Sequence, residues 1–213
     1  MTEPASAAAR PPLRFVALGD SYTIGTAVGR PDERWPDQLV ARAVGEDGAP
    51  LLDLVANLAV NGFTSRDVIE QELPALPGLS TEFASILVGV NDVVQGVPIA
   101  DYGANAAAIL DALLNLLAPS RIVAVSTPDY TVTPQGAGYG DPATQSEGIR
   151  SVNSVLGRLA IERGILFVDI HDLSRRAATD RALVADDGLH PSGAQYATWV
   201  ERIAPAVEGS LRE

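Results

Sequence analysis

The chain has 213 residues and a formal net charge of -12, it contains no cysteine, and every basic residue is an arginine. Disulfides, thiolate nucleophiles, cysteine-bound metals, Schiff-base lysines and Ser-Lys dyads are therefore excluded. The negative charge argues against nucleic-acid binding, which requires clustered positive charge. The only histidines are His171 and His190, so a zinc site would depend almost wholly on carboxylates, and we predict no metal and no cofactor.

The length fits one domain, and we expect a flexible N-terminal segment over residues 1–12 followed by a single domain over residues 13–213. Residues 1–12 lack the continuous apolar stretch of a secretion signal. Nowhere does the chain approach the roughly 20 apolar residues of a membrane span. We therefore predict a cytoplasmic protein without a membrane span. The sequence does not indicate its oligomeric state.

Short apolar runs alternate with segments whose apolar residues recur every three or four positions. The runs predict buried strands at 13–18, 51–55, 85–88, 121–126 and 166–170. The segments between and after them predict helices at 36–44, 65–73, 101–117, 145–163 and 192–207. This alternation is typical of a parallel sheet covered on both faces. We expect an α/β fold, a three-layer α/β/α sandwich with a five-stranded parallel sheet in the flavodoxin-like order.

One long irregular segment, 127–142, is rich in proline, glycine and tyrosine and follows the fourth predicted strand. Open parallel sheets bind ligands outside the carboxyl ends of their strands. We therefore expect this loop, with Tyr130 and Tyr139, to wall a pocket for the acyl or the alcohol part of a substrate.

Three residues at opposite ends of the chain could form a catalytic triad. Ser21 follows the first strand within Gly19-Asp20-Ser21, and Asp187 and His190 belong to Asp187-Gly188-Leu189-His190-Pro191. A serine hydroxyl is a weak nucleophile until a base such as histidine takes its proton. A carboxylate on the second ring nitrogen then fixes the imidazole. We prefer Asp187 for that role, with Asp186 as the alternative.

Two further motifs could stabilise an oxyanion. Gly62 stands in Asn61-Gly62, and Asn91 stands in Gly89-Val90-Asn91-Asp92, each after an apolar run. The candidate donors are the backbone N–H groups of Ser21 and Gly62 and the side-chain amide of Asn91. Such donors are worth several kcal/mol when they are preorganised around the developing charge.

These four blocks resemble the SGNH hydrolases, the GDSL-like esterases and lipases, in their order and in their spacing of about one strand–helix unit. The resemblance spans most of the chain. It implies a three-layer α/β/α fold and metal-independent hydrolysis through an acyl-enzyme. It also implies Ser21, Asp187 and His190 as the triad, and Ser21, Gly62 and Asn91 as the oxyanion hole.

We therefore expect a serine-dependent carboxylic-ester hydrolase that acts on small soluble esters with short acyl groups. An acyltransferase or thioesterase could use the same triad, and a lysophospholipase or carbohydrate deacetylase is a further alternative. A flavodoxin-like binding module is the non-enzymatic alternative. The sequence argues against it, because no glycine- and threonine-rich phosphate loop follows the first strand.

Several other polar and aromatic residues are expected to serve the structure. Asp20 and Asp92 should brace their loops through hydrogen bonds, and His171 is interpreted as structural. We expect Trp35 and Trp199 to pack in the core or at its rim and not to stack on a substrate.

Overall fold

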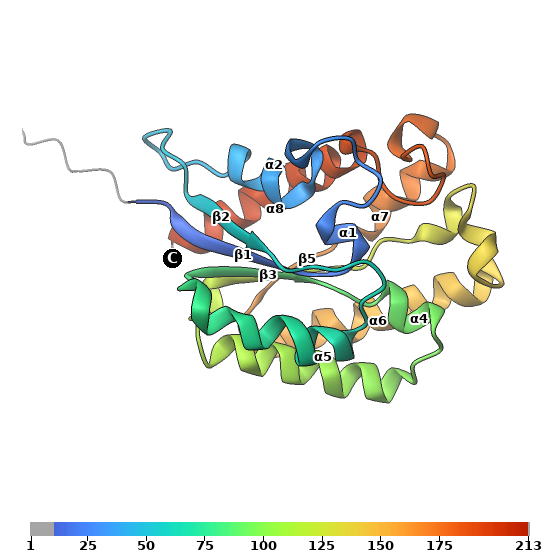
Figure 1. Ribbon diagram of the computed structural model, residues 1–213, viewed down its shortest axis with the longest axis horizontal. Coiled ribbons are helices and arrows are strands. Elements are labelled where there is room, and N and C mark those ends of the chain that lie inside the picture. The colour runs from blue at the N-terminus through green and yellow to red at the C-terminus, as the bar shows by residue number, and fades with distance from the viewer. Residues whose placement is uncertain (1–10, 213) are drawn as a thin grey trace, which may run out of the picture.

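A computed structural model describes residues 11–212. Within them, five parallel strands form one sheet in the order β2-β1-β3-β4-β5, which confirms the expected flavodoxin-like arrangement (Figure 1). The strands are β1 Leu13–Gly19, β2 Leu52–Asn57, β3 Phe83–Leu87, β4 Ile122–Val125 and β5 Leu166–Val168. The N-terminal segment expected at 1–12 lies, for residues 1–10, outside the described part of the chain.

The central strands are mostly apolar because helices cover both faces of the sheet. In β1 every residue from Phe15 to Gly19 is buried, and all of β3 and β4 is buried. β1 pairs with both β2 and β3, so its carboxyl end lies between those of two neighbouring strands. This end of β1 is where the chain reaches Ser21.

Helices form the two outer layers. They are α1 Ser21–Ile24, α2 Trp35–Arg42, α3 Ser65–Asp67, α4 Val90–Val94, α5 Ile99–Leu114, α6 Pro142–Glu162, α7 His171–Ser174 and α8 Gly193–Arg212. Figure 1 shows α2 and α8 on one face of the sheet and α5 and α6 on the other. Each face has its own apolar cluster. Trp35 and Trp199 are both 0% exposed in the α2–α8 cluster, as the packing interpretation predicts.

The segment expected to be a regular helix at 65–73 is broken. One α turn, α3, is followed by a π-helical turn at Val68–Glu72 and a 3₁₀ segment at Leu73–Leu79. Two prolines in the 3₁₀ segment, Pro74 and Pro77, lack the N–H that a regular helix needs. The π turn leaves Glu72 buried. Apolar periodicity alone could not distinguish these turns from an α-helix.

The irregular segment 127–142 lies at the carboxyl edge of the sheet and contains two 3₁₀ turns, Tyr130–Val132 and Gly136–Tyr139 (Figure 1). The backbone N–H of Gln135 donates to the carbonyl oxygen of Gly188 at 3.0 Å. This hydrogen bond holds the loop against the turn that carries Asp187 and His190.

A substitution at the end of β1 tests how closely this edge of the sheet is packed. Gly19 has φ of +145°, and a Cβ there would lie 2.1 Å from the carbonyl oxygen of Leu87. Gly19→Ala should therefore lower the free energy of unfolding by roughly 2–4 kcal/mol, measured by urea denaturation. Gly209→Ala is the matched control, because no atom lies within 4 Å of the new methyl group. The control should leave stability unchanged or raise it by up to about 1 kcal/mol, since alanine favours a helix. A Gly19→Ala protein as stable as the wild type would contradict the close approach of β1 and β3.

Candidate active site

Ser21 is the first residue of α1, directly beyond the sheet. Asp20 caps this helix, and its Oδ1 accepts the backbone N–H of Tyr22 at 3.0 Å. The first N–H groups of a helix have no partner within it, so the backbone N–H of Ser21 is not consumed by α1. Gly25 ends the helix in the left-handed conformation. The short turn presents Ser21 with 6% of its surface exposed.

Asp187 and His190 face each other across one tight turn. Asp187 Oδ2 lies 2.5 Å from His190 Nδ1, while its Oδ1 accepts the backbone N–H groups of Leu189 at 2.9 Å and of His190 at 3.0 Å. Gly188 supplies the positive φ of +76° that this turn requires. Asp187, and not the neighbouring Asp186, therefore contacts the imidazole.

The charge on Asp187 is stabilised by this geometry. Partial burial pushes the pKa of Asp187 upward, but the hydrogen bonds from the His190 ring and from two backbone N–H groups outweigh it and hold that pKa below its ordinary value. Asp187 is therefore an anion at neutral pH. An anion at Nδ1 leaves Nε2 as the nitrogen that can exchange a proton with Ser21 or a substrate.

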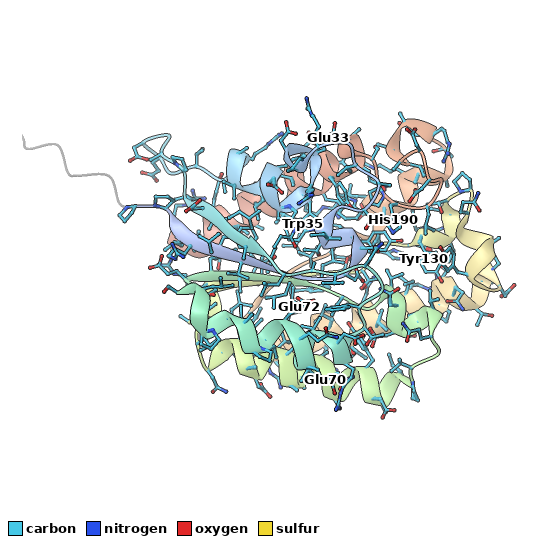
Figure 2. All side chains as sticks on the ribbon, viewed as in Figure 1. Glu33, Trp35, Glu70, Glu72, Tyr130 and His190 are labelled. Atoms are coloured by element: carbon cyan, nitrogen blue, oxygen red, sulfur yellow. The ribbon has the colours of Figure 1, made fainter. Side chains whose placement is uncertain are left out.

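Tyr22 links the segment that carries Ser21 to the turn that carries His190. Its buried ring packs against the imidazole of His190, with ring centroids 5.3 Å apart. Figure 2 shows His190 and Tyr130 at the same end of the molecule, although 60 positions separate them in the chain. The contact between Tyr22 and His190 therefore joins a segment near the start of the chain to a segment near its end at the carboxyl edge of the sheet.

Side-chain hydrogen bonds hold the segments that carry Gly62 and Asn91. Thr26 Oγ1 donates to Asn61 Oδ1 at 2.7 Å, which ties the Gly62 turn to the end of α1. Asn91 Nδ2 donates to the Phe63 carbonyl at 2.9 Å. The amide of Asn91 is thereby oriented by the turn that follows Gly62, whose φ is +83°.

Asp92 braces the same region, as the sequence predicts. Its two carboxylate oxygens accept the backbone N–H of Ser65 at 2.9 Å and the Ser65 hydroxyl at 2.5 Å. Asn105 Nδ2 then donates to the Ser65 hydroxyl at 3.1 Å. Asp20 has a comparable role as the cap of α1, so both aspartates beside the motif residues act on the backbone around them.

One pocket of about 210 Å³ brings the candidate residues together. We call it the Ser21 pocket; it is lined by Ser21, Tyr22, Asn61, Gly62, Val90, Asn91, Val94, Tyr130, Tyr139, Leu189 and His190. Asp187 adjoins it through its contact with His190. His171 is not among the lining residues: its Nε2 lies 3.7 Å from Asp129 Oδ2 in a separate cluster.

Comparison with known families matches residues 17–198 to the model of the GDSL-like lipase/acylhydrolase family. The chain belongs to this family. It is therefore a hydrolase of ester bonds, and the resemblance drawn from its four motifs is confirmed. No curated protein matches the chain.

Solved structures share the fold at low sequence identity. The acetylxylan esterase Axe2 from Geobacillus stearothermophilus is 18% identical, with a TM-score of 0.68 over 92% of this chain and 94% of that one. A lipolytic protein of the G-D-S-L family from Desulfitobacterium hafniense is 19% identical, with a TM-score of 0.71 over 91% and 99%. LAE5, an α/β hydrolase enzyme from the metagenome of Lake Arreo, is 21% identical, with a TM-score of 0.67 over 94% and 97%. At these identities the likeness shows the α/β fold alone.

Residues 11–212 contain no helix that is both long and apolar enough to cross a bilayer. In the same residues, no three side chains of the metal-binding types gather in a way that could hold an ion.

A buried carboxyl group close to the Ser21 segment, that of Glu72, was not singled out from the sequence. Glu72, on the π turn, accepts the backbone N–H of Gly19 at 2.9 Å and is 2% exposed. Burial, with the nearby charge of Asp20, raises the pKa of Glu72 to about 9 despite that hydrogen bond. Burial likewise raises the pKa of Asp20 to about 7. The one sequence signal for Glu72 is its place four positions after Val68, on the buried face of the turn.

The pKa of Glu72 makes stability depend on pH. The folded chain keeps the Glu72 proton up to about pH 9, whereas the unfolded chain releases it near 4.5. Stability must therefore fall as pH rises through this window, because the unfolded state binds fewer protons. Glu72→Gln keeps an oxygen for the Gly19 N–H but cannot ionise. Its gain in stability over the wild type should be small near pH 5 and reach at least about 2 kcal/mol near pH 8.

The measurement is urea denaturation of both proteins across this pH range. Glu70→Gln is the matched control, because Glu70 is exposed and pairs with Arg66 on the surface. Figure 2 shows Glu70 at the outer side and Glu72 beside the sheet. A difference between Glu72→Gln and wild type that did not grow with pH would show that Glu72 is not a buried, proton-holding group.

Proposed function

We propose that this protein is a serine-dependent carboxylic-ester hydrolase in which Ser21 is the nucleophile, His190 the base and Asp187 the group that orients His190. The observation that supports this most directly is that Ser21, His190, Gly62 and Asn91 line a single pocket. The 2.5 Å contact between Asp187 and His190 supports it further. Two structures of the Geobacillus esterase are described as catalytic mutants in which a serine or an aspartate is replaced by alanine, which fits the same roles.

In this mechanism His190 Nε2 takes the proton of Ser21 while the serine oxygen bonds to the acyl carbon. Asp187 stabilises the imidazolium that forms. The tetrahedral intermediate collapses, its bond to the alcohol oxygen breaks, and His190 returns the proton to that oxygen. Water then attacks the acyl-enzyme with the same base, and releases the acid and the free serine.

The mechanism also requires that the negative charge that develops on the carbonyl oxygen be stabilised. We assign its stabilisation to the backbone N–H groups of Ser21 and Gly62 and to the Nδ2 of Asn91. Asn91 already has one amide contact, to the Phe63 carbonyl, so its orientation is set before the substrate binds. Donors held in advance cost no reorganisation as the charge forms.

The size of the Ser21 pocket supports a preference for short acyl groups. Its volume of about 210 Å³ is below that of typical small-molecule sites, which is roughly 300–1,000 Å³. Val90, Val94 and Leu189 give it an apolar lining, which suits a small hydrocarbon group. Small soluble esters are therefore the proposed substrates, in preference to lipid aggregates.

Ser21→Ala tests the nucleophile. It should reduce hydrolysis of p-nitrophenyl acetate by a factor on the order of 10³ or more, since the substitution removes the hydroxyl proposed to attack the acyl carbon. Circular dichroism should show an unchanged fold. Ser154→Ala, at an exposed position on α6, is the matched control and should keep full activity. Substantial activity in Ser21→Ala would remove Ser21 from the mechanism.

A series of p-nitrophenyl esters tests the acyl preference. The value of kcat/KM should be highest for acetyl to butyryl esters and fall by about tenfold or more at octanoyl, because a longer chain leaves the pocket for water. Val94→Ala should shift the optimum toward longer chains by enlarging the lining. A rate that rose steadily with chain length would contradict the small acyl pocket while leaving the role of Ser21 intact.

A further inference from the structure

A second hollow adjoins the Ser21 pocket on the other side of the histidine. It has a volume of about 410 Å³. We call it the Gln135 hollow; it is lined by Gln135, Gly138, Tyr139, Asp187, Leu189 and His190. Tyr139, Leu189 and His190 line both spaces and so stand between them. The candidate oxyanion donors line the Ser21 pocket alone.

From this arrangement we infer that the Gln135 hollow binds the alcohol part of the substrate and favours a hydroxyl-rich, sugar-like alcohol. The inference rests on the proposed function and assigns a specificity role to Gln135 and Tyr139. It also gives a role to the 127–142 loop, which connects β4 to α6 and carries both residues.

The direction of proton transfer supports the inference. His190 must return a proton to the alcohol oxygen as the ester bond breaks, so that oxygen lies beside the imidazole. The acyl carbon and its oxyanion lie toward Ser21, Gly62 and Asn91. The remainder of the alcohol therefore extends from His190 away from the oxyanion donors, into the hollow that His190 and Asp187 border.

The lining of the hollow indicates the kind of alcohol. Gln135 is exposed and offers an amide that can both donate and accept hydrogen bonds with hydroxyl groups. Tyr139 is 45% exposed and offers an aromatic face to the apolar C–H face of a sugar ring. Among the described residues no arginine lines the hollow, and the carboxylate of Asp187 does, so a phosphate-bearing alcohol is disfavoured. Its volume lies within the range of small-molecule sites.

Both residues are held in place before a substrate binds. The ring of Tyr139 packs edge-on against Tyr130, with centroids 5.9 Å apart, and the Tyr130 hydroxyl donates to Gln145 Oε1 at 2.7 Å. The Gln135 backbone N–H donates to the Gly188 carbonyl, and its side chain runs beside Gly188, where a Cβ would lie 3.0 Å from Cγ. Side chains held in this way lose less freedom on binding than mobile ones.

Two acetyl esters with different alcohols test the inference, because they share the acyl group. Ethyl acetate presents a small alcohol, and an acetylated methyl β-xylopyranoside presents a hydroxyl-bearing ring. Gln135→Ala should lower kcat/KM for the sugar acetate about fivefold, with less than about twofold change for ethyl acetate. Tyr139 also lines the Ser21 pocket, so Tyr139→Ala is judged by the ratio of kcat/KM for the sugar acetate to that for ethyl acetate, which should fall about tenfold. Tyr139→Phe keeps the ring and should retain most of the wild-type preference. Gln71→Ala, an exposed glutamine on the π turn, is the control.

Equal losses on both esters, or none on either, would overturn the inference. So would a lysophospholipid that was hydrolysed faster than the sugar acetate and lost rate in the same variants. A wild-type protein that cleaved neither acetyl ester would count against the proposed function instead.

Saturation-transfer NMR with free methyl β-xylopyranoside tests sugar binding in the Gln135 hollow separately from catalysis. Binding that weakens in Gln135→Ala and Tyr139→Ala supports the subsite, and no binding to the wild type refutes it.

Discussion

The close approach of β1 and β3 at their carboxyl ends is the constraint on which the rest of this site depends. Gly19 and Gly89 both have φ of +145°, and a Cβ would lie 2.1 Å from the Leu87 carbonyl oxygen at Gly19 and 2.9 Å from Thr127 Oγ1 at Gly89. Two adjacent parallel strands can therefore turn sharply outward side by side. One turn carries Ser21 and the other carries Asn91. Glycines precede these turns in this chain because the sheet edge has no room for a side chain at Gly19 or Gly89.

The degree of burial determines the role of each carboxyl group in this region. Asp20, Glu72 and Asp92 are buried, and burial raises the pKa of each. They accept backbone N–H groups, Asp20 and Glu72 from the segment around Ser21 and Asp92 from Ser65. Asp187 is partly exposed, its pKa is lowered, and it faces the imidazole as an anion. Carboxyl groups thus supply both structural hydrogen-bond acceptors and an electrostatic partner, and solvent access separates the two uses.

The sequence predicted the strands, their parallel order and the four motifs, because apolar runs and short motifs are local features. Side-chain contacts between segments that are distant in the chain could not be predicted from it. The broken helix at 65–73 depends on the proline-bearing segment that follows and on the buried Glu72. Tyr22 gains its importance only from the His190 ring, 168 positions away. Gln135 lies in the loop that was expected to wall the pocket but was not itself predicted to matter, and its hydrogen bond to Gly188 joins parts of the chain that no periodicity relates.

The positions of the aromatic residues also have a spectroscopic consequence. Both tryptophan side chains, Trp35 and Trp199, are buried in the α2–α8 layer, and neither lines the Ser21 pocket. Three tyrosines, Tyr22, Tyr130 and Tyr139, do line it. Intrinsic tryptophan fluorescence should therefore report unfolding of the α2–α8 layer and should not change when a ligand binds in the Ser21 pocket. Tyrosine absorbance is the optical signal that senses occupancy.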